Sequence, residues 1–281
     1  MKNFIKRTLT GFIFVVITTA LILINEWTFL AFLLISNIWL SIEFFRIASH
    51  DNAHPLSFTS ILTGTIAIFL SFGILKFDFN ISVLWLIIIP ALFIFIEELF
   101  LNKENPLRNI SVSFLSLIYI TIPLITSILL VFENDFGFQI EKGDAFHPEL
   151  LIGILTLIWI FDSLAYCVGV PLGKHKLFVR VSPKKSWEGT IGGALFVIVA
   201  GIFMSKFIPA ISQTDWIIIS ALVIVFGTIG DLIESLFKRS INVKDSGETL
   251  PGHGGLLDRL DSFIFTLPWV LIYFILKNLI S

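Results

Sequence analysis

Long apolar stretches recur along almost the whole chain, and they constrain its fold more than any other feature. A helix needs about 20 mostly apolar residues to cross a bilayer, and the sequence predicts nine such spans. Their limits are 8–25, 27–42, 58–75, 81–96, 110–132, 150–170, 190–207, 216–237 and 260–280. The second and fourth runs are short, so eight or ten spans are alternative counts. With 56% hydrophobic and only 14% charged residues, a soluble globule is excluded, and we expect an all-α polytopic membrane helix bundle.

The distribution of Lys and Arg predicts how the bundle is oriented. The basic start, from Lys2 to Arg7, precedes an apolar run as in a signal peptide. No small-x-small cleavage pattern precedes Glu26, so we interpret this run as an uncleaved first span. Basic residues in short loops stay in the cytoplasm, which favours a cytoplasmic N-terminus. All Lys and Arg residues then lie inside, except Lys76, Lys142, Lys206 and Lys277.

The same spans predict the organisation of the chain. Residues 1–132 form N-terminal transmembrane helices, and residues 150–281 form a C-terminal transmembrane catalytic region. That region carries two cytoplasmic motif loops, 171–189 and 238–259, and the polar segment 133–149 lies outside. The single cysteine, Cys167, excludes an intramolecular disulfide and a multi-cysteine metal site.

Charge, glycine and histidine are concentrated in the segment 235–261. It reads Ser-Leu-Phe-Lys-Arg-Ser-Ile-Asn-Val-Lys-Asp-Ser-Gly-Glu-Thr-Leu-Pro-Gly-His-Gly-Gly-Leu-Leu-Asp-Arg-Leu-Asp. The cations are Lys238, Arg239, Lys244 and Arg259, and the carboxylates include Asp245, Asp258 and Asp261. Glycines around His253 allow backbone N–H groups to approach an anion closely. The segment therefore has what a site for phosphate and metal needs.

Carboxylates in apolar spans are costly to place there, and they are functional candidates by default. Asp162 lies deep in the sixth span. On the eighth span, four polar residues at i, i+3, i+4 and i+7 share one helical face. They are Asp231, Glu234, Ser235 and Lys238.

Asp258 and Asp261 stand three apart at the start of the ninth span, so they also share a face. Together with Asp231 they supply hard oxygen ligands at the cytoplasmic boundary. Magnesium takes oxygen ligands and usually binds through a few carboxylates and substrate phosphates, so we predict a Mg²⁺ site formed by Asp231, Asp258 and Asp261.

Each of these candidates also has a structural interpretation. Asp162 is then a hydrogen-bonding partner of a neighbouring span. Glu234 is an ion-pair partner of the lysine one turn later, which is the interpretation we favour for Glu234. Asp245 is the partner of the lysine before it, and His253 makes a structural hydrogen bond in its loop.

The loop 171–189 carries a second cationic group. Its basic and hydroxyl side chains are Lys174, Lys176, Arg180, Lys184, Lys185, Ser182 and Ser186. A polybasic loop at the inner surface favours contact with anionic lipid over a nucleotide site, and both interpretations hold if the substrate is an anionic lipid. Gly189, Gly192 and Gly193 then open the seventh span, where small residues allow close helix packing.

At these two stretches the chain resembles the phosphatidate cytidylyltransferases, or CDP-diacylglycerol synthases. The family signature S-x-hydrophobic-K-R-x4-K-D-x-small-x2-L-P-x-H-G-G-hydrophobic-x-D-R-hydrophobic-D is matched at every specified position of 235–261. The upstream family motifs D-S-G-A-Y, G-K-H-K and S-P-K-K-T-W-E-G correspond to 162–166, 173–176 and 182–189. Leu164 and Ser186 depart from them.

The resemblance implies that CTP reacts with phosphatidate to give CDP-diacylglycerol and pyrophosphate, and that a homodimer is one arrangement of the enzyme. We expect a bacterial plasma membrane as its location. The phosphates of CTP or the departing pyrophosphate are assigned to Lys238, Arg239, Lys244 and Arg259, with His253 and Asp245 nearby. The phosphatidate head group is assigned to Arg180, Lys184 and Lys185. Further substrate-binding candidates are Asp162, Lys174, Ser182 and Ser235.

Two rival functions remain open. The first is another CTP-dependent lipid transferase or a polyprenol kinase, which shares carboxylates and basic loops. The second is an ion or solute transporter, in which Asp162 and Asp231 form a cation path. The clustering of carboxylates at one face, and the many cations in the loops, favour the enzyme.

Overall fold

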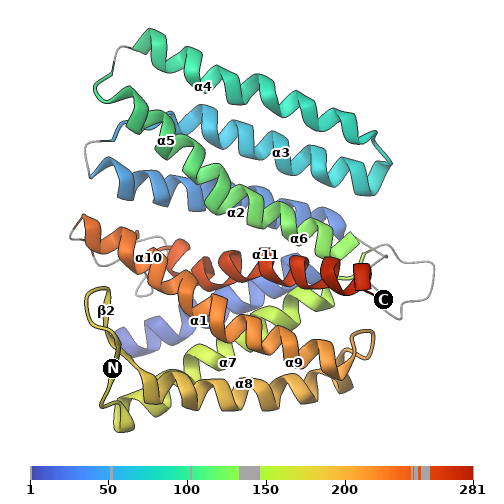
Figure 1. The fold of residues 1–281 in the computed structure, drawn as a ribbon, viewed down its shortest axis with the longest axis vertical. Coiled ribbons are helices and arrows are strands. Elements are labelled where there is room, and N and C mark those ends of the chain that lie inside the picture. Colours follow the sequence, from blue (N-terminus) through green and yellow to red (C-terminus); the bar gives the residue numbers. More distant parts are fainter. Residues whose placement is uncertain are drawn as a thin grey trace. The chain divides into compact units, whose positions relative to one another are not determined.

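A computed structural model describes residues 2–50, 53–101, 103–132, 146–241, 243, 246–247 and 254–280 (Figure 1). The first half of the chain holds α1 Lys2–Leu23, α2 Glu26–Ser49, α3 Ser57–Phe77, the 3₁₀ helix η1 Ile81–Ile87, α4 Ile88–Leu101, α5 Pro106–Ser116, the π-helix η2 Leu117–Thr121 and α6 Ile122–Phe132. The second half holds α7 Glu149–Leu172, β1 Lys176–Phe178, β2 Ser182–Ser186, α8 Trp187–Phe207, α9 Gln213–Leu222, the π-helix η3 Val223–Gly227, α10 Thr228–Ser240 and α11 Leu257–Ile280.

Eight helical segments of the described chain are long and apolar enough to cross a membrane. They are Glu26–Ser49, Ser57–Phe77, Ile81–Leu101, Pro106–Phe132, Glu149–Leu172, Trp187–Phe207, Gln213–Ser240 and Leu257–Ile280, and Leu9–Leu23 is a shorter apolar helix. The all-α membrane bundle is therefore confirmed. The second and fourth spans are not short as predicted, because polar residues at their ends continue the helices to 24 and 21 residues.

A β-hairpin in the loop 171–189 was not predicted. Strands β1 and β2 pair antiparallel, with Lys176 opposite Ser186 and Phe178 opposite Ser182. The basic residues of this segment predict a loop, because its charge conceals the strand pattern.

The described chain divides into two compact units, and each unit is made of two separate stretches of the chain. The first unit contains residues 1–132 and 240–260, and the second contains residues 133–239 and 261–281. Most of the segment 235–261 thus belongs to the same unit as the N-terminal helices.

In the first unit, α2 packs against α3 and α5, and α3 packs against α4 and α6. Helix α2 begins at a capping box, in which the Asn25 side chain accepts hydrogen bonds from the backbone N–H groups of Trp27 and Thr28. Such a cap satisfies donors that have no partner within the helix. The cap and the apolar packing together hold α2 in place along its length.

In the second unit, α7 packs against α8, and α8 packs against α9 (Figure 1). A Cβ atom on Gly193 would lie 2.9 Å from the Cβ of Ala165, so the glycine permits the close approach of α8 to α7. This confirms the close packing predicted for the start of the seventh span. Gly153 of α7 similarly faces the ring of Trp216 in α9, and a Cβ there would overlap the ring.

The contact between Gly153 and Trp216 predicts a stability effect. Because Trp216 is fully buried, the ring has little room to move, and Gly153→Ala should destabilise the protein by about 1–3 kcal/mol through overpacking. Thermal unfolding in detergent should show a melting temperature several degrees lower. The matched control is Gly227→Ala, where the nearest side-chain atoms would lie 3.6 Å from the new methyl group. A melting temperature for Gly153→Ala equal to that of the control would contradict the packing argument.

Candidate functional site

Glu188 organises the hairpin that precedes α8. Its carboxylate accepts hydrogen bonds from the backbone N–H groups of Lys174 and His175 at 3.1 Å and from the His175 ring Nδ1 at 2.6 Å. Ser186 caps α8 with its hydroxyl, which accepts from the Gly189 N–H at 3.2 Å. These contacts fix the basic segment at the start of α8. Neither Glu188 nor His175 was singled out from the sequence, although both lie within the matched motifs.

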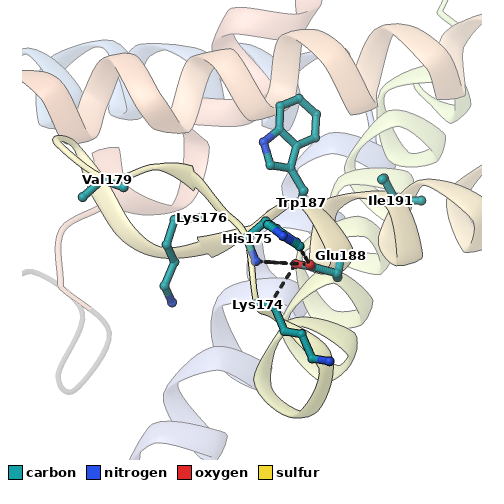
Figure 2. A pocket seen from close by; sticks show the side chains of 7 residues that line it. All are labelled: Lys174, His175, Lys176, Val179, Trp187, Glu188 and Ile191. Atoms are coloured by element: carbon teal, nitrogen blue, oxygen red, sulfur yellow. Dashed lines mark hydrogen bonds and ion pairs between the residues drawn. The ribbon is translucent and has the colours of Figure 1, made fainter.

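An open pocket lies beside this carboxylate (Figure 2). It is lined by Lys174, His175, Lys176, Val179, Trp187, Glu188 and Ile191. Figure 2 shows the two lysines on one side of the Glu188–His175 pair and the Trp187 ring on the other. The pocket therefore offers cations beside an apolar surface, which suits an amphiphilic anion.

Asp231 forms an ion pair with Lys185. The Lys185 Nζ lies 2.6 Å from Asp231 Oδ2, and the Ser235 hydroxyl donates to Asp231 Oδ1 at 3.3 Å. Lys185 had been assigned to the lipid head group and Asp231 to a metal, so the structure joins two residues that were given separate roles. In this arrangement Lys185 neutralises the carboxylate.

Asp231 and Asp162 interact electrostatically with Asp261, as does Lys185. These three carboxylates come from α10, α7 and α11 of one unit. Asp261 is buried and accepts a hydrogen bond from the Ser262 N–H at 2.6 Å. Within the residues that the structure describes, no three His, Cys, Asp or Glu side chains form a group that could hold a metal ion. The Mg²⁺ site assigned to Asp231, Asp258 and Asp261 stays a prediction.

Glu234 and Lys238 form the ion pair expected from their spacing of four residues, and both side chains are buried. The structural interpretation of Glu234 is thus confirmed. Arg239, one residue further along α10, is exposed and donates to the Val181 carbonyl at 3.5 Å. Of the other predicted cations, Lys174, Arg180, Lys184 and Arg259 are exposed.

Asp258 holds the two ends of a loop together in the first unit. Its Oδ2 accepts from the Ser246 N–H at 3.1 Å, the Ser246 hydroxyl at 3.0 Å and the Gly255 N–H at 2.8 Å. A side chain with this role anchors the loop, and the metal role assigned to Asp258 stays a prediction. Lys244, Asp245 and His253 lie outside the described residues.

Glu43 of α2 is a second carboxylate at the same loop. It is 1% exposed and accepts from the Ser246 hydroxyl at 3.2 Å, the Leu256 N–H at 2.9 Å and the Leu257 N–H at 2.7 Å. Glu43 was not among the predicted site residues, because the predicted second span ends at residue 42. A carboxylate among Phe44, Phe45 and Ile47 meets the criterion that singled out Asp162, and that signal was present.

Fold and site together define a polytopic α-helical membrane protein with acidic and basic side chains concentrated around two motif loops. The chain belongs to the cytidylyltransferase family, whose model matches residues 5–276.

Curated relatives resemble parts of the chain. It is 42% identical over 133 residues to a phosphatidate cytidylyltransferase of Staphylococcus haemolyticus strain JCSC1435, which covers 47% of this chain and 50% of that protein. It is 46% identical over 114 residues to the phosphatidate cytidylyltransferase of Staphylococcus aureus strain COL, which covers 40% of this chain and 44% of that protein. The matched part of the chain thus spans half or less of the length of these curated relatives.

Removing the Glu188 carboxylate should loosen the hairpin. Glu188→Ala leaves the N–H groups of Lys174 and His175 without this acceptor, and we expect trypsin to cleave after the basic residues of 174–185 several-fold faster in the detergent-solubilised protein. Glu149→Ala, which removes a carboxylate at the start of α7, is the control. Equal cleavage rates for the two variants would show that Glu188 does not hold the hairpin.

Proposed function

We propose that this protein is a phosphatidate cytidylyltransferase, which transfers the cytidylyl group of CTP to phosphatidate and releases pyrophosphate, as a step of phospholipid biosynthesis. The observation that carries the proposal is membership of the cytidylyltransferase family across residues 5–276, together with relatives named for this activity. The uninterrupted signature of 235–261 supports it.

The chemistry requires charge compensation more than proton transfer. A phosphatidate phosphate oxygen attacks the α-phosphorus of CTP, a new P–O bond forms, and the bond from the α-phosphorus to the bridging oxygen breaks to release pyrophosphate. The attacking oxygen is already ionised at neutral pH, so no catalytic base is needed. The barrier is the approach of one anion to another, which fixed cations and in-line positioning lower.

Residues of the chain are assigned to these tasks. Lys244 and Arg259 bind the phosphates of CTP and the departing pyrophosphate. Arg239 is assigned to the same phosphates, and His253 and Asp245 belong to the same motif loop as Lys244. Lys238 is buried in an ion pair with Glu234, so its proposed role is to stabilise α10, which carries Asp231, rather than to bind a phosphate directly. Asp231 and Asp261 are the residues that would hold Mg²⁺, and the ion when bound supplies charge neutralisation between phosphate oxygens. Lys185 then keeps Asp231 neutralised in the absence of substrate.

The pocket of Figure 2 is assigned to the lipid head group. Lys174 and Lys176 would face the phosphate, and Trp187 and Ile191 would face the glycerol and the start of the acyl chains. Their exposed fractions, 52% and 57%, leave these apolar side chains accessible to lipid. Arg180 and Lys184, which are exposed in the same hairpin, extend the cationic surface.

The reaction can be tested with purified protein in mixed micelles of detergent and phosphatidate. With CTP labelled at the α-phosphate and Mg²⁺ present, we expect label in a lipid product and release of unlabelled pyrophosphate. A polyprenol kinase would instead transfer the γ-phosphate and leave CDP. Absence of labelled lipid from folded protein under these conditions would refute the proposed function.

An Asp→Asn pair gives this assay a site-specific control. Asp261→Asn should lower turnover by about 100-fold or more, because it removes a carboxylate that would hold the Mg²⁺ ion on which charge neutralisation of the phosphates depends. Asp78→Asn should leave turnover unchanged, since Asp78 is exposed and has a φ of 53°, a conformation that Asn adopts readily. Similar turnover in both variants would remove Asp261 from the site.

We also propose that the N-terminus and both motif loops face the cytoplasm of a bacterial plasma membrane, and that the enzyme is a homodimer. The distribution of basic residues supports the orientation, and the family resemblance supports the dimer.

Cysteine labelling tests the orientation. In a chain with Cys167→Ala, an impermeant maleimide added to intact cells should label Gln213→Cys, at the start of α9, but not Glu104→Cys, between α4 and α5. Both positions are exposed in the structure, so permeabilised cells should give labelling at both. The reverse pattern in intact cells would invert the orientation.

A further inference from the structure

Glu43 is a buried carboxylate far outside the family signature, yet it contacts the signature segment directly. Its distance along the chain from Leu256 is 213 residues. A carboxylate that is 1% exposed is costly to bury unless donors compensate its charge. Three of its donors, Ser246 Oγ and the N–H groups of Leu256 and Leu257, come from the segment 246–257. The burial of this charge is therefore coupled to the positions of Ser246, Leu256 and Leu257.

Two of these donors are at the N-terminus of α11. The Leu256 carbonyl accepts from the N–H groups of Arg259 and Leu260, so Leu256 precedes the first helical residue, Leu257. The first N–H groups of a helix have no partner within it, and the helix dipole favours a negative charge there. Glu43 supplies both an acceptor and a charge at this position, from a helix far away along the chain.

Ser246 joins Glu43 to Asp258. Its hydroxyl lies 3.2 Å from Glu43 Oε2 and 3.0 Å from Asp258 Oδ2, and its single proton can be donated to one of them at a time. A Cβ on Gly255 would overlap Ser246 Oγ and the Glu43 carboxylate. A side chain larger than glycine therefore does not fit at position 255. Ser246 and Gly255 are both held by hydrogen bonds to Asp258, and Ser246 also contacts Glu43.

We propose that Glu43 is a positioning residue for the cytidylyl transfer. By fixing the start of α11 and Ser246, it sets where Asp258 and Arg259 stand and where the loop between Gly247 and Gly254 begins and ends. This inference rests on the proposed function for its effect on CTP, whereas its effect on the loop is independent of any activity.

The test compares Glu43→Gln with Glu98→Gln. Glu98 is a matched control because it is buried in the same unit and accepts a hydrogen bond from Asn109 Nδ2 at 2.6 Å, away from the loop. Glutamine has one acceptor oxygen and an NH₂ donor, so Glu43→Gln cannot accept from both Leu256 and Leu257. We expect kcat to fall about tenfold, equivalent to one lost charged hydrogen bond, and KM for CTP to rise several-fold. KM for phosphatidate should stay within about twofold, and Glu98→Gln should leave all three constants unchanged.

Hydrogen–deuterium exchange of the peptide 254–260 provides a readout that does not need activity. The amides of Leu256 and Leu257 should exchange at least tenfold faster in Glu43→Gln than in the unsubstituted protein or in Glu98→Gln. A variant with unchanged exchange and an unchanged KM for CTP would overturn the proposal, even if its melting temperature were lower, because that result describes a structural role alone.

Ser246→Ala keeps the proposal falsifiable if Glu43→Gln does not fold. It leaves the Glu43 charge in place and removes one donor, so the same changes in exchange and in KM for CTP should occur on a smaller scale. Unchanged exchange and kinetics would overturn the proposal here too. If the unsubstituted protein makes no lipid product, the proposed function has failed, and the exchange comparison still decides whether Glu43 holds the segment.

Discussion

The cost of placing charge among apolar helices governs this structure. A carboxylate or an ammonium group in such surroundings is stable only when an opposite charge or several hydrogen-bond donors compensate it. The described chain meets this condition repeatedly, in the pairs Lys185–Asp231, Lys238–Glu234 and Lys277–Asp215 and in the donors around Glu43. Each of these contacts joins a helix to another element or stabilises the end of a helix. The polar groups therefore fix the positions of helices relative to their neighbours within a unit, which non-directional apolar packing alone does not fix.

The distribution of these contacts separates structural from functional charge. Asp215 receives hydrogen bonds from the hydroxyls of Tyr273 and Ser212 as well as from Lys277. Such a saturated group has no capacity left for a ligand and serves as a tie between α9 and α11. Asp231 and Asp261, by contrast, share their surroundings with a further carboxylate and one lysine. An excess of negative charge of this kind is favourable for a cation, in line with the Mg²⁺ role proposed for Asp231 and Asp261.

The sequence was sufficient for features that depend on local spacing. Hydropathy located the spans, the interval of four residues predicted the Glu234–Lys238 pair, and small residues predicted the close contact of α8 with α7. It was insufficient where the partner is distant. Nothing local to residue 43 shows that its acceptors would be used by Leu256 and Leu257, and the hairpin at 176–186 depends on Glu188, which follows it. Span ends were wrong because helices continue through polar residues once caps or ion pairs compensate them.

The signature of 235–261 therefore carries the chemistry of the family but not all of its geometry. Asp258 lies inside the signature and closes the loop from within, whereas Glu43 lies in an apolar helix and closes the same loop from outside. The signature includes Asp258 but not Glu43, although both carboxylates lie within hydrogen-bond distance of the Ser246 hydroxyl. The N-terminal helices, which the sequence presents only as hydrophobic, thus contribute a charge that holds Ser246 and the start of α11. Their role is to hold the loop as well as to cross the membrane.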